Sequence, residues 1–220
     1  MARLKLKLAQ PLSEARKTNP RLDEAALFVE GLFGRPLRND PKTLHASLFP
    51  IMPFVSNGGG VFNPGLRNFD TVHELTHSED LAYLKEFKGL KKFLNVLNIY
   101  FNISKKIYLE GRAVFASHIF RDKIRRFELY FTSLLIGTYG AAANIFNQTM
   151  LLPKWIWVPF LFFGVIYWPF HNALCMLAKK LDDPVAAFRL STEKPPSLFG
   201  IFFPSIFYRK EIEAAQGKEG

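Results

Sequence analysis

Residues 69–87 read FDTVHELTHSEDLAYLKEF, and the pattern in this stretch is that of a helix. Asp70 or Thr71 can cap its first turn, and Gly89 follows as a natural stop. An incomplete apolar stripe follows, made of Val72, Leu75, Leu81, Leu84 and Phe87. The sequence therefore predicts a single helix over residues 69–87.

Two histidines lie four residues apart within this helix, at positions 73 and 77 of the motif His-Glu-Leu-Thr-His. Side chains at i and i+4 share one helix face, so His73 and His77 can present two imidazoles to one metal ion. Glu74 lies beside them and can take a proton from metal-bound water. A catalytic zinc needs a third protein ligand, and Glu110, within the stretch IYLEGRA on a second predicted helix, is the candidate.

HELTH followed by E-G-x-A on a later helix resembles the gluzincin type of zinc metallopeptidase. The resemblance covers residues 45–120 and implies that zinc (Zn2+) is bound by His73, His77 and Glu110, with Glu74 as general base and a polypeptide as substrate. Tyr108 and His118 are candidate donors to the oxyanion, and His118 can alternatively donate to a ligand carboxylate.

Gluzincins also tend to have an extended edge strand before the motif helix, and it holds the backbone of the substrate. Residues 47–55 or residues 57–63 can supply such a strand here. The glycines at 58–60 lack the lysine and serine or threonine of a phosphate-binding loop, so they indicate only conformational freedom.

The elements around the motif predict a mainly α fold with a minor β component. Residues 1–20 are expected to form a flexible basic lead, followed by a short amphipathic helix over residues 22–33. More helix is expected over residues 90–120. Together these segments predict a helical, zincin-like metal-binding domain over residues 21–127, with one short edge strand.

Two uncharged runs, residues 129–153 and 155–178, predict a transmembrane helical hairpin over residues 128–180. Each run is long enough to cross a hydrocarbon core of about 30 Å as a helix. Basic residues flank the outer ends of the pair, which predicts an integral membrane protein in a lipid bilayer, with both termini and the metal domain on the cytoplasmic side, or the matrix side in an organelle.

The last segment, residues 181–220, is expected to be a polar linker and a tail at the membrane interface. Residues 198–208 (LFGIFFPSIFY) are apolar but too short to span.

The composition argues against a nucleic-acid-binding protein and excludes an internal disulfide. The formal net charge of +10 comes without basic residues interleaved with aromatics, so we expect no nucleic-acid partner. The single cysteine, Cys175, excludes an internal disulfide. His45 carries no functional pattern and His171 suits a packing role, while Glu79 and Asp80 are expected to be solvated acids.

The favoured interpretation is a membrane-anchored zinc metallopeptidase. The alternative is a non-catalytic membrane protein, such as an accessory subunit or assembly factor of a membrane complex, in which HELTH is coincidental or a vestigial metal site. An intramembrane protease is disfavoured because HELTH lies in a polar segment rather than in either uncharged run.

Overall fold

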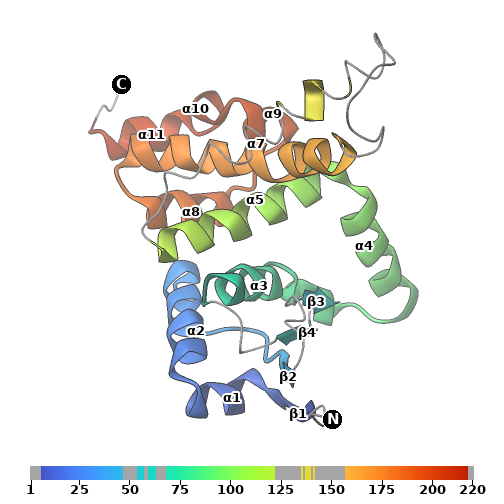
Figure 1. The fold of residues 1–220 in the computed structure, drawn as a ribbon. Helices are drawn as coiled ribbons and strands as arrows, with labels where there is room; N and C mark the ends of the chain where they lie inside the picture. The colour runs from blue at the N-terminus through green and yellow to red at the C-terminus, as the bar shows by residue number, and fades with distance from the viewer. Residues whose placement is uncertain are drawn as a thin grey trace. The chain divides into compact units, whose positions relative to one another are not determined.

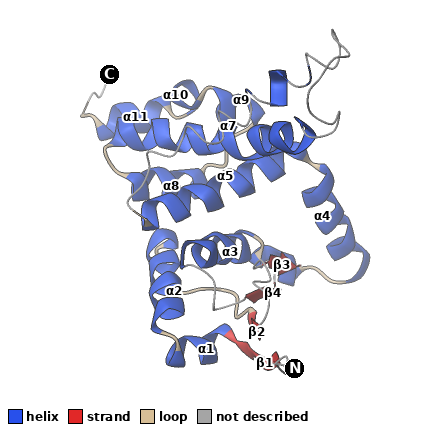
Figure 2. Ribbon diagram, in the orientation of Figure 1, coloured by secondary structure: helices blue, strands red, loops and turns tan. Residues whose placement is uncertain are grey.

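The computed structural model describes residues 6–46, 54–56, 59–62, 68–121, 135, 137–139, 141 and 157–217, which are mainly helical (Figures 1 and 2). The predicted mainly α fold class with a minor β component is confirmed. The chain divides into two compact units, Met1–Asn102 with Ala116–Asp122 and Ile103–Phe115 with Lys123–Gly220. Helix α5 (Ile103–Phe120) contributes to both units.

The first unit contains a four-stranded sheet in the order β1-β2-β4-β3. Its strands are β1 (Leu6–Pro11), β2 (Lys42–Ala46), β3 (Phe54–Ser56) and β4 (Gly59–Phe62). β1 and β2 are antiparallel, β2 and β4 parallel, and β4 and β3 antiparallel. Of the two segments expected to supply an edge strand, the first therefore supplies β3 at the edge, and the second supplies β4 inside the sheet. Residues 47–53, 57, 58 and 63 lie outside the described residues.

The helices of the first unit are α1 (Leu12–Thr18), α2 (Pro20–Phe33), α3 (Asn68–Asp80), the 3-10 helix η1 (Ala82–Glu86) and α4 (Gly89–Phe101). The predicted helix over residues 22–33 is confirmed by α2. The Asn19 side chain accepts a hydrogen bond from the Leu22 N–H at its start, and Gly34 ends it at φ 65°. α2 packs on α3, and its buried residues are Leu22, Ala25, Ala26, Val29 and Leu32.

The prediction of a flexible lead over residues 1–20 is wrong from Leu6 onward, where β1 and α1 form. Leu12 and Ala15 are buried in the core. Arg16 donates to Asp23 at 2.7 Å and to Glu30 at 2.9 Å, both on α2. The basic residue that suggested a solvated lead therefore has acidic partners on the next helix.

The predicted single helix over residues 69–87 is also corrected, because α3 ends at Asp80 and η1 follows. The side-chain amide of Asn39 donates to the Ser78 carbonyl, which a continuing α-helix would use for the N–H of residue 82. The chain then tightens, and the Leu84 N–H bonds to the Leu81 carbonyl at 3.0 Å.

The second unit is built around α7 (Trp157–Leu181), with α8 (Pro184–Glu193), α9 (Leu198–Phe202), α10 (Pro204–Phe207) and α11 (Arg209–Ala215). Its core includes Phe170, Leu174 and Leu177 of α7. Gly111 of α5 lies against α7 so closely that an added Cβ would lie 2.7 Å from the Phe170 Cβ. α5 and α7 are therefore in near backbone contact at this point.

The described residues cover only part of the predicted membrane hairpin. The first uncharged run falls outside them except for residues 135, 137–139 and 141, whereas α7 covers most of the second run and confirms its helical conformation. Among the described residues, no helix has the length and apolarity needed to cross a membrane.

The prediction of a linker after residue 181 is wrong, because helix α8 begins at Pro184. The Asp183 carboxylate accepts from the N–H groups of Val185 and Ala186 at 2.8 and 3.0 Å, and Pro184 occupies the first helical position.

Candidate metal centre

The motif helix α3 has one buried face and one half-exposed face. Val72, Leu75, Thr76 and Glu79 are buried, and the Thr76 hydroxyl donates to the Val72 carbonyl at 2.8 Å. At 100° per residue, positions 73, 74 and 77 lie on the other side of the helix. The apolar pattern that buries one face of α3 thus leaves the histidines and Glu74 on the half-exposed face.

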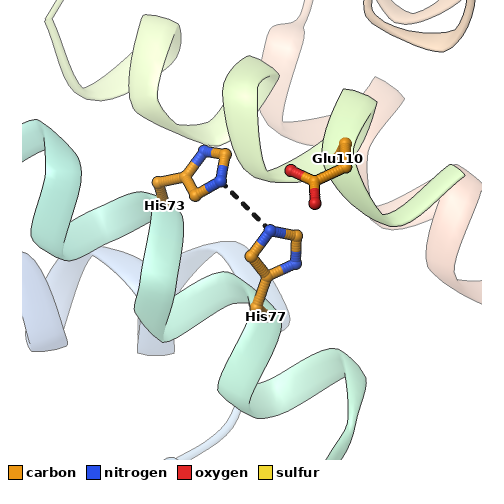
Figure 3. A group of neighbouring side chains, drawn as sticks. All are labelled: His73, His77 and Glu110. Carbon is orange, nitrogen blue, oxygen red and sulfur yellow. Dashed lines mark hydrogen bonds between the residues drawn. The ribbon is translucent and has the colours of Figure 1, made fainter. Parts of the chain in front are cut away.

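The two imidazoles of the motif meet through their Nε2 atoms. The Nε2 atoms of His73 and His77 are 3.1 Å apart, and the rings are nearly perpendicular at 86° (Figure 3). Two nitrogens bound to one tetrahedral zinc at about 2.0–2.1 Å lie about 3.4 Å from each other. The pair is therefore preorganised for a single metal ion to within a few tenths of an ångström.

Glu110 completes the group from helix α5. Ligand atoms of His73, His77 and Glu110 all lie within 4.8 Å of one another, and Figure 3 shows the carboxylate on the side to which the imidazoles point. None of the three side chains is fully exposed. Two imidazoles and one carboxylate form a donor set that zinc accepts, with a fourth position left for water. The residues present therefore fit the predicted metal.

Glu74 is half-buried and lies beside His73 on the chain. It is not one of the three grouped ligands. An acid in this place, next to the ligands but not among them, is suited to exchanging a proton with a water molecule at the centre.

Glu79 is not the solvated acid that the sequence suggested. Its side chain is 1% exposed and accepts from Arg35 at 2.6 Å and from the Asn39 N–H at 3.0 Å. These bonds tie the last turn of α3 to the segment that follows α2. The carboxylate therefore positions the motif helix. The burial of Glu79 could have been predicted from the sequence, because position 79 lies on the same helix face as positions 72, 75 and 76.

Tyr108 has partners that do not suit the predicted oxyanion role. Its hydroxyl donates to the Ser191 carbonyl at 3.0 Å and accepts from Arg112 Nη1 at 2.6 Å. The Arg112 guanidinium is itself buried, donates to Thr192 at 2.7 Å and lies 4.4 Å from the centre of the Phe188 ring. The proton of Tyr108 is thus already used in a buried network that joins α5 to α8.

His118 and His171 are not among the grouped ligands. His118 is buried on α5, about 12 Å along the helix from Glu110, which does not suit a direct hydrogen bond to that carboxylate. His171 is fully buried on α7, 3.7 Å from the Cys175 sulfur and against the Phe115 ring, which agrees with the packing role expected for it. Burial raises the pKa of the Cys175 thiol to about 12.

Comparison with known proteins did not identify a relative of this chain. No protein-family model matches the chain, and no curated protein or solved structure shows significant similarity to it.

Proposed function

We propose that this protein is a zinc-dependent metallopeptidase whose metal is bound by His73, His77 and Glu110. The observation that supports the proposal is the grouping of these ligand atoms within 4.8 Å, although Glu110 stands 33 residues beyond His77 in the chain. Helical periodicity alone accounts for the meeting of the two histidines. It does not account for a carboxylate on another helix that faces both of them.

The chemistry follows from the roles of the neighbouring side chains. Zinc bound here would supply a Lewis acid that activates water and polarises a peptide carbonyl. Glu74 accepts the proton of the attacking water and returns it to the leaving amine. His73 and His77 would bind the metal through Nε2, and the negative charge of Glu110 would offset part of its charge.

Strand β3 is the proposed site for the substrate backbone. It lies at the edge of the sheet and packs beside α3, the helix that carries the motif. An extended peptide can pair with the free side of an edge strand through main-chain hydrogen bonds, which would align it along the motif helix.

The test combines metal content with turnover. We expect about one zinc per chain by elemental analysis, strongly reduced in Glu110→Ala and unchanged in the matched control Glu86→Ala, whose exposed acid lies on η1. Equal zinc in Glu110→Ala and the wild type would reject Glu110 as a ligand.

Glu74→Gln separates catalysis from binding. We expect this variant to keep its zinc and to lose cleavage of an unstructured protein such as casein. Zinc in the wild type without any cleavage would favour the alternative, a non-catalytic protein with a vestigial metal site.

A further inference from the structure

Helix α4 presents several large apolar side chains to solvent on one face. Leu90, Phe93, Leu94 and Phe101 are between 54% and 82% exposed. At 100° per residue they fall within about 100° of one another around the helix. Four large apolar side chains gathered on one helix face mark an interaction surface rather than scattered surface residues.

The charged residues of α4 are all basic. α4 contains Lys91 and Lys92 and no acidic residue, and exposed Lys85 and Lys88 precede it with one acid, Glu86, between them. Lys91 lies to the side of the apolar face, with its ammonium group 4.9 Å from the centre of the Phe87 ring. An apolar stripe bordered by lysines is the pattern of a helix that lies in the interface of a membrane.

We propose that α4 is a membrane-surface helix that binds anionic lipid, inserting its apolar face between headgroups while the lysines contact lipid phosphates. A second copy of the chain is a poorer occupant, because two α4 faces in contact would bring lysines together without any acid on either helix. The proposal is independent of the metal centre, and it attaches the chain to a bilayer through a segment that the sequence analysis treated only as part of the metal domain.

The experiment is flotation of the purified full-length chain with vesicles. We expect binding to phosphatidylcholine vesicles containing one third phosphatidylglycerol, weaker binding at high salt, and little binding to pure phosphatidylcholine. The variant Leu90→Gln/Leu94→Gln removes apolar surface at exposed positions while keeping good helix formers. The affinity of this variant for the anionic vesicles should be at least about tenfold lower than that of the wild type.

The control tests another exposed apolar surface, on helix α9. Phe199 and Phe202 of α9 are both 53% exposed, so Phe199→Gln/Phe202→Gln removes a comparable surface. Unchanged binding in this variant, with loss in the α4 variant, supports the proposal. Binding lost only in the α9 variant, equal binding to neutral and anionic vesicles, or no vesicle binding by the wild type would each overturn it. So would dimerisation in solution that Leu90→Gln/Leu94→Gln abolishes.

Discussion

Replacing Gly111 by alanine should force α5 and α7 apart. The added Cβ would lie 2.7 Å from the Phe170 Cβ and 2.9 Å from the backbone nitrogen of His171. Carbon atoms in good contact lie about 3.5–4.0 Å apart, so the methyl group is about 1 Å too close. Because one of the opposing atoms belongs to the backbone, a change of rotamer cannot relieve the contact. Overpacking of this kind costs about 1–3 kcal/mol.

Gly31 provides a matched control for the same chemical change. It lies in the last turns of α2, is exposed, and an added Cβ there would have no neighbour within 4 Å. Gly31→Ala should therefore stabilise the protein by about 0.5–1 kcal/mol through helix propensity alone. Gly111→Ala gains the same propensity, so the difference between the two variants isolates the helix contact and should be about 1–3 kcal/mol.

Urea unfolding followed by two probes measures this difference. Trp155, Trp157 and Trp168 are the tryptophans of the chain, and all belong to the second unit, so their fluorescence reports on the unit that contains Gly111. Far-UV circular dichroism follows both units and is needed for Gly31→Ala. If Gly111→Ala gained stability as Gly31→Ala does, the close approach of α5 and α7 would be refuted.

Three further predictions concern other groups. Glu79→Gln should lower the free energy of unfolding by about 1.5–3 kcal/mol, because it weakens charge-assisted hydrogen bonds to a buried carboxylate. Urea unfolding followed by circular dichroism measures this, and the control Glu86→Gln, at an exposed position, should change the free energy by less than about 0.5 kcal/mol. Since burial raises the pKa of Cys175 to about 12, the thiolate fraction at pH 8 should be about a thousandfold lower in the native protein than in urea. Alkylation should be correspondingly slower, and equal rates would contradict the burial of Cys175. Burial opposes ionisation of Glu211, but the hydrogen bond from Lys194 holds its pKa below the ordinary value. The melting temperature of the wild type should therefore exceed that of Glu211→Gln at neutral pH, and the difference should vanish as the pH falls through the pKa of Glu211 in the folded protein.

Local patterns predicted the parts of the structure that depend on neighbours in sequence. The helical spacing of His73 and His77 places both rings on one face whatever surrounds them, and α2 follows from its own apolar period and caps. The start of α8 was equally readable, since Asp183-Pro184 is a capping residue followed by the residue best suited to the first helical position. It was missed because residues 181–220 were interpreted as a polar linker and a tail at the membrane interface.

Features that depend on distant partners could not be predicted in this way. Arg16 looks like part of a basic, solvated lead until Glu30 is known to lie opposite it. The end of α3 at Asp80 depends on Asn39, 39 residues from the Ser78 carbonyl to which it donates. Nothing in the sequence around residue 80 marks this ending, because the competing hydrogen bond comes from another element.

Three glutamates in or near the motif show that the residue type alone does not determine the role of a side chain. Glu74, Glu79 and Glu110 are the same side chain; the motif and the resemblance gave roles to Glu74 and Glu110, whereas Glu79 was expected to be a solvated acid. In the structure their environments differ: one is half-buried beside His73, one is buried against Arg35, and one approaches both imidazoles from α5. Helical periodicity alone could have separated the first two, because position 79 shares the face of Val72 and Leu75, whereas position 74 does not. The third could not be assigned from periodicity, since it depends on where α5 lies, and this is why the zinc content of Glu110→Ala is the decisive measurement for the proposed centre.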